Sequence, residues 1–266
     1  MGRARPRPGP HRMTSVFDFP RAYEVAFSYR DVPHEVDALL KFHGGGVASA
    51  LELAAGPGDH ALDLAGRGIR ASTVDLNAAM TARAAERATE RGLALYSATT
   101  GDMVEFDLGE RFDLVLCLID SLAHVLDLDA LVAHLVCVRR HLAPGGAYVA
   151  ETLHPADGFG VGKHTETDWT VERDGVCLRV RWGRPDEPID PVTQVTETVV
   201  TIDVRAPWGE QRLEETMAQR FWTRDELRAA ARLAGLEVTA QYGDFDGGAL
   251  DAEGAWRMIS VLRPVP

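Results

Sequence analysis

Short apolar runs alternate with longer amphipathic stretches between residues 49 and 149. Short apolar runs bounded by turn residues predict buried strands, and apolar positions at a 3.6-residue period predict helices. We expect strands at residues 50–54, 71–75, 94–98, 112–119 and 146–152. Helices are expected between them at residues 60–66, 78–92 and 122–142. Strands that alternate with helices in this way are typical of a parallel sheet built from βα units.

The flanking segments have different patterns. Residues 20–43 carry apolar side chains at helical spacing and stop at three consecutive glycines, which predicts a helical flap. From residue 168 to 222, β-branched and aromatic residues alternate with polar ones, and turn signals divide this stretch into about four antiparallel strands. Thr223 and Glu226 form a capping-box pattern that begins a helix ending at Gly235. Strands at residues 236–242 and 255–262 complete the chain.

These elements predict an α/β fold. Its centre is a doubly wound, seven-stranded, mostly parallel sheet with an antiparallel β insertion after the fifth strand and an N-terminal helical flap. Residues 1–14 form a basic, proline-rich tail expected to be disordered, and residues 15–48 form the flap. The core then comprises residues 49–154 and 223–266. We expect the insertion between them, residues 155–222, to be a cap over the sheet's open edge or the surface of a homodimer.

Composition narrows the set of partners. The net charge of −12 repels phosphate backbones, so we expect no nucleic-acid partner. No apolar run reaches the length of a membrane span, and the N-terminus lacks the apolar region of a secretory signal, so we expect a cytoplasmic protein without a membrane partner. The three cysteines match neither zinc-site nor disulfide spacing, and we expect no metal.

The first strand runs directly into a glycine-rich turn. Glu52, Ala54, Gly56 and Gly58 belong to the sequence Glu-Leu-Ala-Ala-Gly-Pro-Gly, and a helix follows. Glycines let a ligand approach the backbone closely, and the helix N-terminus offers free N–H donors. Asp75 ends the next strand, as in dinucleotide-binding proteins, so the turn alone fits a nicotinamide cofactor as well as other nucleotides.

Later motifs distinguish between these cofactors. Gly101-Asp102-Met103 follows the third strand, Asp120-Ser121 ends the fourth, and Leu-Ala-Pro-Gly-Gly at residues 142–146 leads into the fifth. Together, in this chain order, the motifs resemble those of class I S-adenosylmethionine-dependent methyltransferases that act on small molecules. The resemblance implies the strand order 3-2-1-4-5-7-6 with the last strand antiparallel. It also implies S-adenosylmethionine as cofactor and S-adenosylhomocysteine as product.

The same resemblance assigns cofactor contacts. Asp75 would accept the ribose hydroxyls, Asp102 would accept the adenine amino group, and Met103 would pack on the adenine ring. Tyr23 or Arg30 of the flap would hold the methionine carboxylate. The full predicted cofactor set is Tyr23, Arg30, Glu52, Ala54, Gly56, Gly58, Asp75, Leu76, Asp102, Met103, Leu118 and His124.

The methyl acceptor is less well defined, because methyl transfer needs alignment and exclusion of water more than strong acid–base chemistry. We predict an amine or hydroxyl of a small molecule, with N-methylation narrowly ahead of O-methylation, C-methylation third, and a role in secondary metabolism. His154, after the fifth strand, or Asp120 would serve as base, and Tyr29 would close over the acceptor. The insertion carries Trp169, Trp182, Trp208 and Trp222, most of which we expect to pack in the core, while one would wall the acceptor pocket.

Two other functions fit part of the pattern. A nicotinamide-dependent oxidoreductase fits the glycine-rich turn and Asp75, but the sequence shows no recognisable hydride-transfer pair such as Tyr-x-x-x-Lys. A non-catalytic module that keeps only the cofactor fold is disfavoured by the intact motif residues from Glu52 through Asp102.

Overall fold

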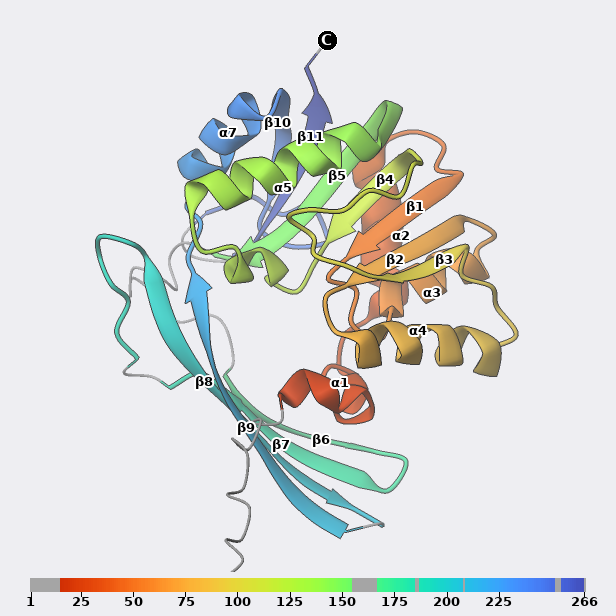
Figure 1. The fold of residues 1–266 in the computed structure, drawn as a ribbon, viewed down its shortest axis with the longest axis vertical. Coiled ribbons are helices and arrows are strands. Elements are labelled where there is room, and N and C mark those ends of the chain that lie inside the picture. The colour runs from red at the N-terminus through yellow and green to blue at the C-terminus, as the bar shows by residue number, and fades with distance from the viewer. Residues whose placement is uncertain (1–14, 155–166, 185–186, 208, 252–254, 266) are drawn as a thin grey trace, which may run out of the picture.

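A computed structural model describes residues 15–154, 167–184, 187–207, 209–251 and 255–265. Its central sheet has the order β10-β11-β5-β4-β1-β2-β3, which is the predicted order 3-2-1-4-5-7-6 (Figure 1). β11 runs antiparallel to both of its neighbours, and the pairs from β5 to β3 are parallel. The strands are β1 (Ser49–Leu53), β2 (Arg70–Asp75), β3 (Ser97–Thr100), β4 (Phe112–Cys117), β5 (Leu142–Leu153), β10 (Leu236–Tyr242) and β11 (Arg257–Pro264). The predicted fold class is therefore confirmed.

Helices cover both faces of this sheet because its strands are apolar on both sides. Along β4, Leu114 and Leu116 pack with the cluster under α2 (Val32–His43) and α3 (Asp59–Gly66). Val115 and Cys117 point the other way, into the cluster under α5 (Leu128–His141) and α7 (Arg224–Leu233). This alternation is the two-residue period of a strand buried on both faces. α4 (Ala78–Glu90) lies beside α3 and contacts β2 and β3.

A separate antiparallel sheet contains the four strands expected in the insertion: β6 (Asp168–Arg173), β7 (Val176–Trp182), β8 (Val195–Ala206) and β9 (Gly209–Arg220). The short helices η1 (Val16–Asp18) and α1 (Pro20–Ala26) pack against its apolar side (Figure 1). Trp169 fixes this contact, because its Nε1 donates to the Ala26 carbonyl at 2.9 Å. η1, α1 and the insertion sheet thus form one layer, whereas α2, the other helix of the predicted flap, packs on the central sheet.

Several predicted boundaries were wrong, including that of the fifth strand, which begins at Leu142 rather than at residue 146. The flap is two helices, because Asp31 caps a new helix at His34 N and Pro33 lies in that helix's first turn. The helix expected at residues 122–142 is split into η2 (Ser121–His124) and α5, because the Asp127 side chain caps α5. The third strand lies at residues 97–100 rather than 94–98, where it pairs with the end of β2.

The other predictions about the architecture have different outcomes. The capping box of Thr223 and Glu226 is present at the start of α7. The predicted disordered tail, residues 1–14, lies outside the described residues. Within the described part of the chain, no helix is long and apolar enough to cross a membrane.

Candidate active site

One large cavity, of about 1410 Å³, opens at the carboxyl ends of the central strands. Ligands of doubly wound sheets bind at this edge, beside the point where strand order reverses. Here that point lies between β1 and β4, and the insertion and flap form the opposite wall. Most of the predicted site residues line the cavity: Tyr23, Tyr29, Arg30, Ala54, Gly56, Asp75, Leu76, Asp102, Met103, Asp120 and His124.

Four predicted site residues do not line it. Glu52 is buried beneath α3, where it accepts from Ala61 N at 2.9 Å and contacts His60 Nδ1 at 3.1 Å, so it fixes the start of that helix. Gly58 has a φ of +75°, and a Cβ there would lie 3.1 Å from the Ala84 Cβ, so its place in the motif reflects close helix packing.

The other two are Leu118 and His154. Leu118 is buried and lines only a much smaller cavity beside the glycine-rich turn. His154 is 6% exposed and is not part of the large cavity's wall, although Thr152 and Leu153 just before it are. Directly after a strand, the backbone turn decides which way a side chain points, and the strand's alternation no longer predicts it.

Asp75 organises the end of the cavity beside the glycine-rich turn. Its Oδ2 accepts from Gly56 N at 2.7 Å and its Oδ1 accepts from Asn77 N at 2.8 Å. Burial raises the pKa of this carboxyl, and the two N–H donors act against that rise. Gly56 and Ala54 both have positive φ, +53° and +48°, so the turn bends sharply at the end of β1. Each Asp75 oxygen keeps a lone pair for a ligand hydroxyl.

Leu76, Asp102 and Met103 lie along the next part of the wall. Leu76 is apolar yet 73% exposed, so its face lies open to the cavity. Burial lowers the pKa of His134 to about 4, which leaves it neutral, and its Nδ1 donates to the Met103 carbonyl at 2.8 Å. His134 thereby fixes the backbone of Met103. No local motif predicts this role, because His134 lies in the middle of α5.

A buried network of charges underlies the flap end of the cavity. Arg30 donates to Glu35 and, through both terminal nitrogens, to Glu151. Arg257 Nη1 lies 2.8 Å from Glu151 Oε1, and Glu35 also contacts His60 Nε2 at 2.8 Å. Burial alone would raise the pKa of Glu151, but the two arginines lower it to about 2. Arg30 is therefore held rigidly at the cavity wall, with most of its donors already used.

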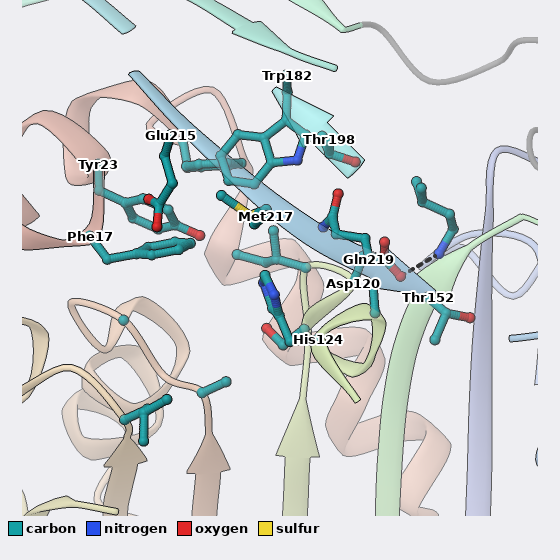
Figure 2. A pocket seen from close by; sticks show the side chains of 18 of the residues that line it. Phe17, Tyr23, Asp120, His124, Thr152, Trp182, Thr198, Glu215, Met217 and Gln219 are labelled. Atoms are coloured by element: carbon teal, nitrogen blue, oxygen red, sulfur yellow. Dashed lines mark hydrogen bonds between the residues drawn. The ribbon is translucent and has the colours of Figure 1, made fainter. Parts of the chain in front are cut away.

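Asp120 and His124 project into the cavity below the insertion (Figure 2). Asp120 has a φ of +54°, and its Oδ1 accepts from Leu153 N at 3.0 Å. Burial raises its pKa to about 8, and the nearby charge of Glu151 adds to the rise. Burial also lowers the pKa of His124, which favours the neutral imidazole. Asp120 can therefore change protonation state near neutral pH, and His124 is a neutral imidazole that can accept a proton.

The opposite wall consists of aromatic side chains of the flap and one face of the insertion sheet. The Phe27 ring centroid lies 5.8 Å from that of Trp169 and 5.6 Å from that of Trp182, and Tyr29 lies 5.9 Å from Trp169. Glu215, Met217 and Gln219 follow one another along the same face of β9 toward the space above His124 and Asp120 (Figure 2). This wall offers ring faces together with a few polar groups.

Comparisons with known proteins agree with this geometry. Residues 50–146 match a family model described as a methyltransferase domain. A dTDP-4-amino-2,3,4,6-tetradeoxy-D-glucose N,N-dimethyltransferase of Saccharopolyspora spinosa is 32% identical over 211 residues, 77% of each chain. A dTDP-3-amino-3,6-dideoxy-alpha-D-glucopyranose N,N-dimethyltransferase of Streptomyces fradiae is 29% identical over 215 residues, 80% of this chain and 79% of the relative.

The fold is also found among solved structures. An S-adenosylmethionine-dependent methyltransferase from Clostridium acetobutylicum superposes with a TM-score of 0.76 over 93% of this chain and 98% of the other, at 17% identity. The alternatives of an oxidoreductase and of a non-catalytic module are therefore set aside. The chain belongs to the class I S-adenosylmethionine-dependent methyltransferases.

Proposed function

We propose that this enzyme N-methylates the amino group of a small hydroxylated molecule of the amino-sugar type. The observation that supports this most directly is the large cavity, in which the glycine-rich turn and Asp75 on one wall face aromatic rings and polar side chains on the other. Aromatic faces stack on the apolar face of a sugar ring and attract a methylated ammonium. The two relatives from Saccharopolyspora and Streptomyces are named as amino-sugar N,N-dimethyltransferases.

The residues at the strand ends fit S-adenosylmethionine. Asp75 would accept the ribose hydroxyls with the lone pairs that its backbone donors leave free. The exposed face of Leu76 and the side chain of Met103 would pack on adenine, and Asp102 would accept its amino group. Tyr23 would lie over the methionine end, since a Cβ at Gly56 would be only 3.6 Å from its ring. The bound cofactor supplies an electrophilic methyl group on a cationic sulfur.

The chain's own contribution to the reaction is orientation and proton removal. An amine attacks only in its neutral form, so a protonated acceptor must first lose a proton. Asp120 and His124 both face the cavity and are the groups that would take it. His154, our other candidate base, is buried outside the described cavity wall, so its assignment remains a prediction without geometric support.

The test is an activity screen by mass spectrometry. The enzyme is incubated with S-adenosylmethionine and a panel of nucleotide-linked and free amino sugars, with the matching hydroxy sugars as controls. We expect addition of one or two methyl groups to amino sugars only. Methylation of the hydroxy sugars at equal rates would contradict the assignment of an amine acceptor.

A further inference from the structure

An ion-pair cluster joins the flap to the helix beside the glycine-rich turn. Glu24 of α1 contacts two arginines of α4: its Oε2 lies 3.1 Å from Arg83 Nε, and its Oε1 lies 3.2 Å from Arg87 Nε. The three side chains are 18%, 9% and 2% exposed, in the order Glu24, Arg83 and Arg87. Solvent screens such sheltered charges less than it screens a surface pair.

Arg87 connects this cluster to the glycine-rich turn. Its Nη1 donates to the Pro57 carbonyl at 2.7 Å, in a buried hydrogen bond. Its Nη2 donates to Asp59 Oδ1 at 2.6 Å, at the first residue of α3. One guanidinium therefore binds the turn between Gly56 and Gly58, the start of the following helix and the flap carboxylate.

The position of Glu24 in α1 links this cluster to the cavity. The preceding residue, Tyr23, lines the cavity, and its ring lies within van der Waals reach of a Cβ built at Gly56. Tyr23 belongs to α1, which also packs on the insertion sheet. A shift of α1 away from α4 would therefore move Tyr23 off the turn. The carboxylate of Glu24 thus sets the distance between the flap and the site of the cofactor's amino-acid end.

We propose that Glu24 is a positioning residue that holds Tyr23 over the glycine-rich turn and thereby slows the release of S-adenosylmethionine and S-adenosylhomocysteine. Glu24 itself lies outside the cavity wall and acts through Arg83, Arg87 and the backbone of α1. This role rests on the cofactor placement proposed above and is independent of which acceptor the enzyme uses. Its failure is therefore distinguishable from a failure of the amino-sugar assignment.

The experiment measures the dissociation rate of S-adenosylhomocysteine by rapid displacement from the full-length enzyme. Glu24→Gln is expected to raise this rate about 5- to 10-fold, the effect of losing a sheltered ion pair worth about 1 kcal/mol. Glu86→Gln is the matched control, because Glu86 also contacts Arg83, at 3.2 Å, but lies on α4 itself and is 60% exposed. Its dissociation rate should stay within twofold of wild type.

Two further measurements separate positioning from general loosening. 5′-Methylthioadenosine lacks the amino-acid end, so its release should be accelerated less than that of S-adenosylhomocysteine in Glu24→Gln. Arg83→Gln, which removes one partner of Glu24, should act in the same direction, and the double variant should show less than the summed effect. Arg83→Gln also serves alone if Glu24→Gln does not fold.

Three outcomes would overturn the proposal. One is a wild-type dissociation rate in a folded Glu24→Gln enzyme. The second is an equal acceleration in Glu86→Gln, and the third is an equal acceleration for both ligands.

Discussion

Replacing Asp75 with alanine should weaken cofactor binding more than any other single change on the strand-end wall. The carboxylate already accepts from Gly56 N and Asn77 N at 2.7 and 2.8 Å, so its orientation is fixed before a ligand arrives. Each oxygen then has a lone pair left for one ribose hydroxyl. A hydrogen bond to a charged group is worth about 1.5–3 kcal/mol. Loss of two should cost about 3 kcal/mol or more, which is at least roughly a 100-fold weaker affinity.

The assay is titration calorimetry with S-adenosylhomocysteine on wild type and Asp75→Ala. Because Asp75 also holds the glycine-rich turn, the ligand-free melting temperature of the variant must be measured in parallel. Asp63→Ala is the matched control, since Asp63 is a carboxylate on the neighbouring helix α3 that contacts Arg67 outside the cavity. An affinity within threefold of wild type in a folded Asp75→Ala enzyme would refute the ribose assignment.

Three further predictions concern the base, the fold and the acceptor wall. If Asp120 is the base, kcat/KM should rise with pH through about 8, and Asp120→Asn should flatten that profile. Burial raises the pKa of Asp120 in the folded state above its value in the unfolded state. The protonated carboxyl therefore stabilises the fold fully at acid pH, and this contribution is lost as pH rises through about 8. The melting-temperature advantage of Asp120→Asn over wild type should grow up to that pH and then level off. Gly146→Ala should lower the free energy of unfolding in urea by about 2–4 kcal/mol, because its Cβ would lie 2.9–3.1 Å from three backbone oxygens. In the control variant Gly145→Ala the Cβ meets no atom within 4 Å, and the positive φ alone should cost about 1 kcal/mol. Trp182→Ala should raise the acceptor KM and leave S-adenosylhomocysteine affinity unchanged in initial-rate and calorimetric measurements, and a selective loss of cofactor affinity would contradict its place on the acceptor wall.

The fold could be predicted because the pattern of the chain is strong where the core is deepest. β4 is apolar on both faces, and strands of this kind alternate with helices that carry their own caps. The errors lie at element ends. Asp127 starts α5 by accepting from Ala130 N, and Asp31 restarts the flap helix in the same way. Such a cap involves only about three residues. An apolar periodicity averaged over two or more turns therefore does not show where one helix ends and the next begins.

The site could be predicted where chain order alone brings residues together. Ala54, Asp75, Asp102 and Asp120 lie at or just after the ends of parallel strands, and the carboxyl ends of those strands meet at one edge of the sheet. The buried charge network could not be predicted, because Arg257 and Glu35 are far apart in sequence and neither belongs to a local motif. Nothing in its sequence context showed that Glu151 would bind two arginines.

The two walls of the cavity also explain why the cofactor is easier to predict from sequence than the methyl acceptor. The cofactor wall consists of turns at strand ends, where the backbone conformation requires particular residue types, as at Gly56. The proposed acceptor wall is one face of an antiparallel sheet, where the backbone accepts a wide range of side chains. Thr198 and Met217 face the cavity from neighbouring strands, paired directly in register, without disturbing either strand. Acceptor specificity can therefore change by substitution on β8 and β9 while the central sheet and its cofactor turns remain the same.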